Sequence, residues 1–117
     1  MRFKYNNKSC KCLLHHIHDS IWEAEVCQYL YSLLKSKRIL AYKTQHSIDI
    51  TVKGKTVCTH IVDFYVQKLN KKWFFAEAKG LATPMWQLKR KLTKALYPKI
   101  PYVVIYRGLL RLIDEEV

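Results

Sequence analysis

The sequence predicts an α/β fold in which a mixed sheet is flanked by helices. Two features carry this prediction. An amphipathic helical stripe is followed by three strand-like segments separated only by short turns, which indicates an antiparallel meander. A second helical segment and a short apolar strand come next, and a helical crossover of this kind joins parallel strands. With 117 residues, 50% of them hydrophobic, the chain has the size of one domain, residues 1–117.

The first part of the chain is expected to contain an arm and then a helix. Residues 1–18 are polar at first and then alternate loosely, so we expect a strand or a short hairpin in this N-terminal arm. From Ser20 to about Ser36, apolar residues recur at helical spacing, and basic residues follow at the C-terminal end, where they suit the helix dipole. The apolar positions of this helix are Trp22, Val26, Leu30, Leu33 and Leu34.

Three strands are predicted in the middle of the chain. His46–Val52 alternates between apolar and polar residues, and Gly54-Lys55 supplies a turn. Thr56–Lys68 is rich in β-branched and aromatic residues, so the two segments predict a hairpin. After a second turn at residues 69–72, Trp73–Lys79 is predicted as the third strand.

The last part of the chain is expected to contain a helix, a strand and a tail. Thr83 is a helix cap followed by Pro84 at the first helical position, and Pro98 ends the helix. The buried face of this helix is predicted from its apolar side chains, which are Met85, Leu88, Leu92, Ala95 and Leu96. Residues 102–106 form an apolar run typical of a strand covered on both faces. Residues 107–117, which end in the acidic Asp114-Glu115-Glu116-Val117, are expected to be a C-terminal tail.

The charge of the chain points to an anionic partner. With 21 Lys and Arg against 9 Asp and Glu, the formal net charge is +12, and nucleic acid is the first partner to consider. A membrane surface ranks lower, because the basic residues are scattered instead of forming one stripe on a helix. No apolar run reaches the roughly 18 residues that span a bilayer, and the first eight residues lack the apolar stretch of a signal peptide. The expected location is therefore the cytoplasm.

Cysteine and histidine residues raise the separate question of zinc. The four cysteines, which a reducing cytosol would keep as thiols, are Cys10, Cys12, Cys27 and Cys58. The metal-capable side chains near the N-terminus are Cys10, Cys12, His15, His16 and His18. Their spacing does not match the ligand pairs usual in structural zinc sites, so an extended segment that carries these residues is the plainer interpretation. A zinc-stabilised RNA-binding protein is kept as the remote alternative.

The candidate site begins with Asp63, Glu77 and Lys79. Side chains two apart in a strand share a face, so Glu77 and Lys79 project together, about 6.6 Å apart along the strand. Asp63 is the only acid in an apolar and aromatic stretch of the preceding strand, and a buried carboxylate needs a partner. One interpretation is a structural ion pair between Asp63 and Lys79, with Glu77 at the edge of the sheet.

Glu23 favours a functional interpretation, although it also has a structural one. Ser20 and Glu23 form a capping box, in which both side chains satisfy backbone amides at the start of the helix. At 100° per residue, however, Glu23 lies at the edge of the buried stripe and is directed toward the sheet, whereas Glu25 is directed toward water. Three acids that converge would repel one another, and a divalent cation is the ordinary remedy.

Oxygen ligands of this kind suit Mg²⁺ or Mn²⁺. Such an ion polarises a phosphate and lowers the pKa of a bound water, and Lys79 beside it would orient the water and offset negative charge. The helix that begins at Pro84 lies close after this strand, so we expect Gln87, Lys89 and Lys91 to contact the DNA backbone. A solvated basic face is the alternative for these three residues.

Other polar and aromatic residues are expected to be structural. His46 and His60 lie in predicted strands among β-branched residues, where a hydrogen-bonded structural histidine is the better interpretation. Trp86, Tyr97 and Tyr102 are expected to be core or interface aromatics, with base stacking as the lesser alternative.

The pattern of Asp63, then Glu77-Ala78-Lys79, with Glu23 on a preceding helix, resembles the PD-(D/E)XK signature of the restriction-endonuclease-like superfamily, whose core has the same αβββαβ order. More closely, the chain resembles small phage proteins of that superfamily related to phage junction-resolving endonucleases. The similar blocks are residues 19–25, 62–64, 77–80 and 88–92 followed by Tyr97-Pro98. The resemblance covers about residues 3 to 106. Val62 replaces the usual proline, and the His-rich residues 14–18 replace a glycine and an aromatic.

The resemblance implies Mg²⁺-dependent cleavage of DNA. The implied metal ligands are Glu23, Asp63, Glu77 and the carbonyl of Ala78, and Lys79 is the implied catalytic lysine. The expected protein is thus a metal-dependent endodeoxyribonuclease of phage type in the host cytoplasm, and branched or junction DNA is one of the substrates left open. Paired cleavage needs two sites, so a homodimer is expected. A DNA-binding module that keeps the fold without chemistry is the alternative.

Overall fold

The computed structural model describes residues 10–11, 17–18, 20–80 and 82–117, of which residues 10–11 and 17–18 are described by their backbone. A small two-stranded sheet is formed by β1 (Cys10–Lys11) and β2 (Ile17–His18). The strands of the main sheet are β3 (Ile39–Val52), β4 (Lys55–Lys68), β5 (Trp73–Lys79) and β6 (Tyr102–Tyr106). The helices are α1 (Ile21–Lys35), α2 (Pro84–Leu96) and α3 (Arg111–Glu116).

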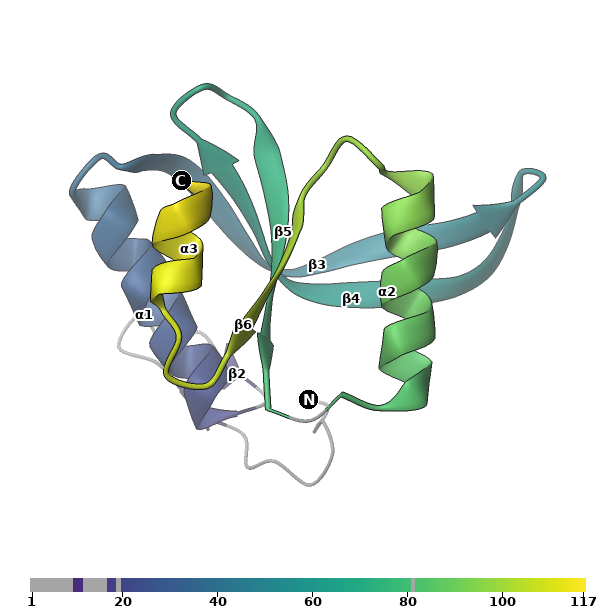
Figure 1. The fold of residues 1–117 in the computed structure, drawn as a ribbon, viewed down its shortest axis with the longest axis horizontal. Coiled ribbons are helices and arrows are strands. Elements are labelled where there is room, and N and C mark those ends of the chain that lie inside the picture. Colours follow the sequence, from purple (N-terminus) through teal and green to yellow (C-terminus); the bar gives the residue numbers. More distant parts are fainter. Residues whose placement is uncertain (1–9, 12–16, 19, 81) are drawn as a thin grey trace.

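The predicted α/β class with a mixed sheet is confirmed. The main sheet has the order β3-β4-β5-β6, in which β3, β4 and β5 form an antiparallel meander and β6 runs parallel to β5. Helix α2 makes the crossover between the two parallel strands, as this connection requires. Figure 1 shows α1 and α3 together on one side of the sheet and α2 on the other. The site strand β5 is therefore an interior strand.

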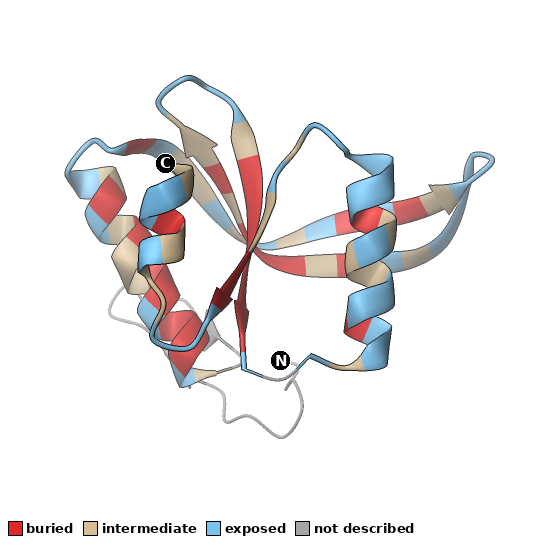
Figure 2. Cartoon of the chain, in the orientation of Figure 1, coloured by how far each residue is buried: buried red, intermediate tan, exposed pale blue. Residues whose placement is uncertain are grey.

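Two core clusters lie on opposite faces of the sheet. The α1-side core includes Leu30 of α1, Phe64 of β4, Phe74 of β5 and Ile113 of α3, all fully buried. The smaller α2-side core consists of Ile48, Val62 and Phe75, with Tyr65, Ile100 and Tyr102 packed against it. Figure 2 shows buried positions concentrated where the strands cross and on the inner side of α1. Phe74 and Phe75 point to opposite faces, as the alternation of the strand predicts.

The expected C-terminal tail is wrong. Residues 107–117 contain α3, and Ile113 is fully buried in the α1-side core. The Tyr29 hydroxyl of α1 donates a hydrogen bond to Asp114, and Lys68 forms an ion pair with Glu116 at 3.3 Å. The acidic residues that suggested a solvated tail thus join the last helix to α1 and β4.

The expected buried face of α2 is also wrong. Met85 is 61% exposed, Leu88 is 51% exposed, and the residues of this helix that are buried are Trp86 and Thr93. Successive residues of a helix turn by about 100°, so positions 86 and 93 lie on one face of α2 and the apolar stripe of Met85, Leu88 and Leu92 lies on a different face. The helix packs through its bulkiest ring, and most of its apolar stripe faces outward.

One further boundary differs from the sequence pattern, whereas the short hairpin expected in the N-terminal arm agrees with the pairing of β1 and β2. Strand β3 begins at Ile39 rather than at His46, and it pairs with β4 along nearly its whole length. At the N-terminus, β1 pairs antiparallel with β2, and Cys10 is the ladder partner of His18. The other members of the Cys/His cluster, Cys12, His15 and His16, lie outside the described residues. None of the described helices has the length and apolar character needed to cross a membrane.

Candidate active site

The four residues predicted to carry chemistry are all inside the molecule. Glu23 on α1 is 1% exposed, Asp63 on β4 and Glu77 on β5 are each 0% exposed, and Lys79 on β5 is 3% exposed. The interpretation that places Glu77 at the edge of the sheet is wrong, since β5 lies between β4 and β6. Burying carboxylates costs free energy unless other groups compensate their charge, so their surroundings decide what the site can do.

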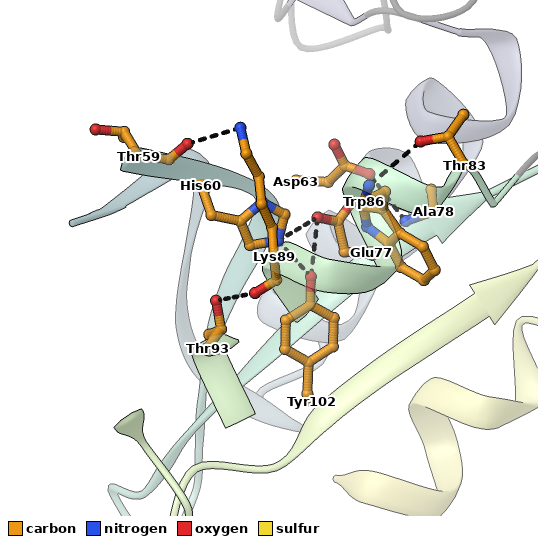
Figure 3. Close-up of polar contacts among 10 residues, drawn as sticks. All are labelled: Thr59, His60, Asp63, Glu77, Ala78, Thr83, Trp86, Lys89, Thr93 and Tyr102. Carbon is orange, nitrogen blue, oxygen red and sulfur yellow. Dashed lines mark hydrogen bonds and ion pairs between the residues drawn. The ribbon is translucent and has the colours of Figure 1, made fainter. Parts of the chain in front are cut away.

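Asp63 is fixed by the backbone of β5. The ladder between β4 and β5 ends at the pair Phe64 and Ala76, and Asp63 follows directly beyond it. There the N–H of Ala78 donates to Asp63 Oδ2 at 2.9 Å. The Asp63 side chain thus links β4 to β5 where the ladder has ended, and its carboxylate lies next to the Glu77-Ala78-Lys79 segment (Figure 3).

Glu77 belongs to a buried hydrogen-bonded network with Tyr102 and His60. The Tyr102 hydroxyl donates to Glu77 Oε1 at 3.1 Å, and His60 Nε2 lies 2.7 Å from the same hydroxyl and 3.5 Å from Glu77 Oε1. The phenol has one proton and donates it to Glu77, so His60 Nε2 acts as a donor toward the phenol oxygen. Figure 3 shows these three side chains gathered between the sheet and α2.

The charges of Glu77 and Asp63 both act on the Tyr102 hydroxyl. Burial raises the pKa of Tyr102 far above its ordinary value, and the charge of Glu77, its hydrogen bond and the charge of Asp63 raise it further. The Arg90 guanidinium, 5.7 Å from the Tyr102 ring centroid, acts in the opposite direction. The Tyr102 hydroxyl therefore stays protonated and remains a donor to Glu77.

Lys79 lies against α2. Its Nζ is 4.3 Å from the centroid of the Trp86 ring, a cation–π distance, and Arg90 approaches the same ring at 5.8 Å. Two cationic groups, Lys79 and Arg90, therefore lie against one buried aromatic ring of α2.

Glu23 reaches the sheet through a residue that the sequence did not single out. The Ser20 hydroxyl accepts the N–H of Glu23 at 3.1 Å, which is half of the expected capping box. The Glu23 carboxylate accepts from Gln45 Nε2 at 2.8 Å. Glu25 is exposed, so the predicted directions of the two glutamates are confirmed.

Gln45 and Asp63 mark a local change in the hairpin. Thr44 pairs with Phe64 and His46 pairs with Val62, and the intervening residues, Gln45 and Asp63, are not a ladder pair. Gln45 has a φ of 51°, in the left-handed region. Past this point the strand changes the face that it buries, because Phe64 belongs to the α1-side core and Val62 to the α2-side core. Glu23 is thus connected to the position in β3 that lies across from Asp63.

The fit of a divalent metal can be judged from these contacts. Buried carboxylate oxygens are suitable donors for Mg²⁺, and Asp63 and Glu77 are both buried and both act electrostatically on Tyr102. Among the described residues, however, no group of three or more His, Cys, Asp or Glu side chains is placed to hold a metal ion. Lys79 lies two residues from Glu77 on β5, and Glu23, whose carboxylate accepts from Gln45, belongs to no such group.

The residues predicted to contact DNA are on α2. Gln87 and Lys91 are exposed, whereas Lys89 is partly buried and its Nζ donates to the carbonyl of Thr59 on β4 at 3.0 Å. Gln87 and Lys91 therefore point to solvent, and Lys89 connects α2 to the sheet. Arg90 was not predicted, although it lies over the Tyr102 ring.

Two contacts of the candidate site were not predicted from the sequence: that of His60 and Tyr102 with Glu77, and that of Gln45 with Glu23. His60 is a buried, hydrogen-bonded histidine as expected, but its contact with Glu77, shared with Tyr102, depends on the parallel register that pairs Glu77 with Val104. Gln45 carried no signal, since glutamine is not a residue that favours the left-handed region.

Comparison with protein-family models, curated proteins and solved structures finds no match to this chain.

Proposed function

We propose that this protein is a Mg²⁺-dependent DNA endonuclease with a restriction-endonuclease-like core, of the kind found in phage junction-resolving enzymes. The observation that carries the proposal is the pair Asp63 and Glu77, two fully buried carboxylates on adjacent strands that both act electrostatically on Tyr102, with Lys79 on the same strand as Glu77. The net charge of +12 suits a polyanionic substrate. The αβββαβ order of the chain is compatible with such a core.

The proposed metal ligands are Asp63, Glu77 and the carbonyl of Ala78; Glu23, whose carboxylate accepts from Gln45 and belongs to no three-acid group among the described residues, is not included. A bound Mg²⁺ would polarise the phosphate and lower the pKa of an attacking water. The chain's own groups have separate tasks. The Ala78 N–H and the Tyr102 hydroxyl orient the two carboxylates, and Lys79 offsets negative charge on the phosphate.

Substrate contact is assigned to the exposed side of α2. Gln87 and Lys91 would contact DNA phosphates, and Lys89 would support them by holding the helix against β4. Because paired cuts in branched DNA need two sites, the active species is proposed to be a homodimer in the host cytoplasm.

A second candidate function is a DNA-binding module without chemistry. It is favoured by the fact that each of the three carboxylates accepts a hydrogen bond from a protein group, and by the lack of a three-acid metal group among residues 20–80 and 82–117. In this case the buried network would serve to position α2 on the sheet.

Cleavage assays separate the two candidates. Supercoiled, linear and branched DNA would be incubated with Mg²⁺, Mn²⁺ or a chelator, using the wild type, Asp63→Ala and Lys79→Ala. The nuclease proposal expects metal-dependent cutting that falls by roughly a hundredfold or more in both variants. Matched controls are Asp49→Ala and Lys53→Ala, which alter an exposed acid and an exposed lysine of the β3–β4 hairpin. DNA binding without any metal-dependent cutting by the wild type would favour the module.

A further inference from the structure

A row of stacked rings crosses the sheet on the face that carries α2. His46 of β3, Tyr65 of β4 and Trp73 of β5 form what we term the aromatic column. The ring centroids of His46 and Tyr65 are 4.3 Å apart at an interplanar angle of 15°, and those of Tyr65 and Trp73 are 4.4 Å apart at 14°. The rings are therefore nearly parallel and in van der Waals contact.

The aromatic column is at the surface. All three of its residues are partly exposed, whereas the neighbouring Phe75 is buried and stacks on Tyr65 at 5.1 Å. Tyr65 uses both ring faces, one toward His46 and one toward Trp73, which makes Trp73 an end of the column. An indole with water-accessible surface at the end of a stack is suited to receive another flat ring.

The column is bordered by cationic side chains. Lys43 is exposed and its Nζ lies over the Trp73 ring, 5.5 Å from the centroid, so a base that stacks on Trp73 must displace this flexible side chain. The exposed turn that leads into Trp73 contains Lys71 and Lys72. Flat rings that alternate with flexible lysines are the two components of a surface that binds single-stranded nucleic acid, in which bases stack and phosphates are neutralised.

We propose that the aromatic column binds an unpaired segment of nucleic acid, with a base stacking on Trp73 and the adjoining phosphates held by Lys43, Lys71 and Lys72. A duplex is a poorer ligand for this surface, because its bases are already stacked on one another and do not offer free faces. The lysines exclude a purely apolar ligand as the best match, since they would lose hydration without gaining a charge partner.

The column is continuous with the candidate active site. Phe75 contacts both Tyr65 and, at 5.8 Å between ring centroids, Tyr102, whose hydroxyl donates to Glu77. A nucleic-acid strand bound on the column therefore lies on the same face of the sheet as Tyr102 and Glu77. The further conclusion that the substrate contains a single-stranded part, such as a flap or an open junction, rests on the proposed nuclease function. Binding by the column does not rest on it.

The binding test uses the full chain without metal. Intrinsic tryptophan fluorescence would be titrated with oligothymidine of about 16 nucleotides, a typical site size, and with a hairpin duplex of equal charge. The variants are Trp73→Ala, Trp73→Phe and Lys43→Ala. The matched controls are Tyr106→Ala, an exposed ring on β6, and Lys53→Ala, an exposed lysine at the β3–β4 turn. Circular dichroism and thermal unfolding show which variants are folded.

The proposal expects tighter binding of the oligothymidine than of the duplex and quenching of tryptophan fluorescence by the single strand. Trp73→Ala should weaken that binding by roughly tenfold or more, and Trp73→Phe should remove the quenching while retaining most of the affinity. Lys43→Ala should weaken binding more than Lys53→Ala. Equal affinity of the wild type and folded Trp73→Ala for the single strand would overturn the proposal. Because a chelator is present throughout, this result is independent of whether the protein cuts DNA.

Discussion

The Tyr102 hydroxyl connects three elements of the molecule. It belongs to β6, donates to Glu77 on β5 and lies within hydrogen-bond distance of His60 on β4. A carboxylate that accepts a hydrogen bond in a buried place depends on that donor more than an exposed carboxylate does. At the residue scale, the hydrogen bonds of the candidate site therefore also stabilise the fold.

Replacing Tyr102 by phenylalanine tests this dependence. Tyr102→Phe keeps the ring and removes the donor, so we expect the free energy of unfolding to fall by about 1–3 kcal/mol. The measurement is urea denaturation at neutral pH. Tyr106→Phe is the matched control, because Tyr106 is 51% exposed and its hydroxyl is near water. A Tyr102→Phe variant as stable as this control would show that the hydrogen bond contributes little.

His46 gives the fold a dependence on acid. Burial, and secondarily the charge of Lys43, lowers the pKa of His46, which stacks on Tyr65 and lies near Phe75. The unfolded chain then binds a proton more readily than the native one, so stability falls as the pH drops from about 6.5 toward the lowered pKa and is unaffected by His46 above that range. His46→Phe keeps a ring in the stack but has no group that binds a proton. When the pH is lowered, we therefore expect its free energy of unfolding to fall less than that of the wild type. Unfolding by urea at neutral and mildly acidic pH measures the difference, and equal losses would contradict it.

At the scale of elements, the β3–β4 hairpin depends on its two-residue turn. Lys53 has a φ of 51° and Gly54 a φ of 79°, which is the conformation of a tight hairpin turn with two left-handed residues. Glycine accepts this conformation without strain and lysine does not.

The turn yields opposite expectations for its two residues. Gly54→Ala should lower the free energy of unfolding by about 1 kcal/mol, and Lys53→Asn should raise it by a few tenths, since asparagine tolerates the left-handed region. An added Cβ at Gly54 meets nothing within 4 Å, so the cost is one of backbone conformation. Gly80→Ala is the control, because Gly80 also has open space and has no positive φ. Thermal unfolding of the three variants makes the comparison, and equal effects of the two glycine replacements would contradict it.

The elements also show what the sequence was able to predict. Helix α1 was predicted well because its cap, Ser20, and its buried stripe follow from local rules. Asp63 and Glu77 were placed on facing strands by the same kind of reasoning. Helix α2 has an equally regular apolar stripe, yet it packs through Trp86, because the side that meets the sheet is decided by its contacts with β3 and β4, which are distant in sequence. The left-handed Gln45 and the short α3 likewise depend on contacts that are distant in sequence.

At the scale of the whole molecule, electrostatics should dominate the encounter with DNA. A chain of net charge +12 displaces counterions from each phosphate that it neutralises. The logarithm of the affinity should therefore fall linearly with the logarithm of the salt concentration, with a slope of about −0.7 to −0.9 for each phosphate contacted. This holds for the nuclease and for the binding module alike.

Lys91 provides a test of where on the molecule that charge acts. Lys91→Ala, on the exposed side of α2, should reduce the magnitude of the slope by about one unit, and Gln87→Ala should leave it unchanged. Lys35→Ala is the control, because Lys35 ends α1 on the opposite side of the sheet. Fluorescence anisotropy with labelled DNA at several salt concentrations measures the slopes. Equal slopes for Lys91→Ala and the wild type would remove α2 from the DNA-contacting surface.

The mixed direction of the sheet has a consequence for the order of folding. Strands β3, β4 and β5 are joined by short turns and can pair soon after collapse, whereas β6 must wait until the whole α2 crossover has closed. In refolding followed by pulsed hydrogen exchange, amides of the meander should gain protection before those of Val104 and Ile105. Simultaneous protection would mean that the crossover forms in the rate-limiting step. Since Tyr102 enters with β6, the hydrogen-bonded network around Glu77 is then among the last parts of the molecule to be completed.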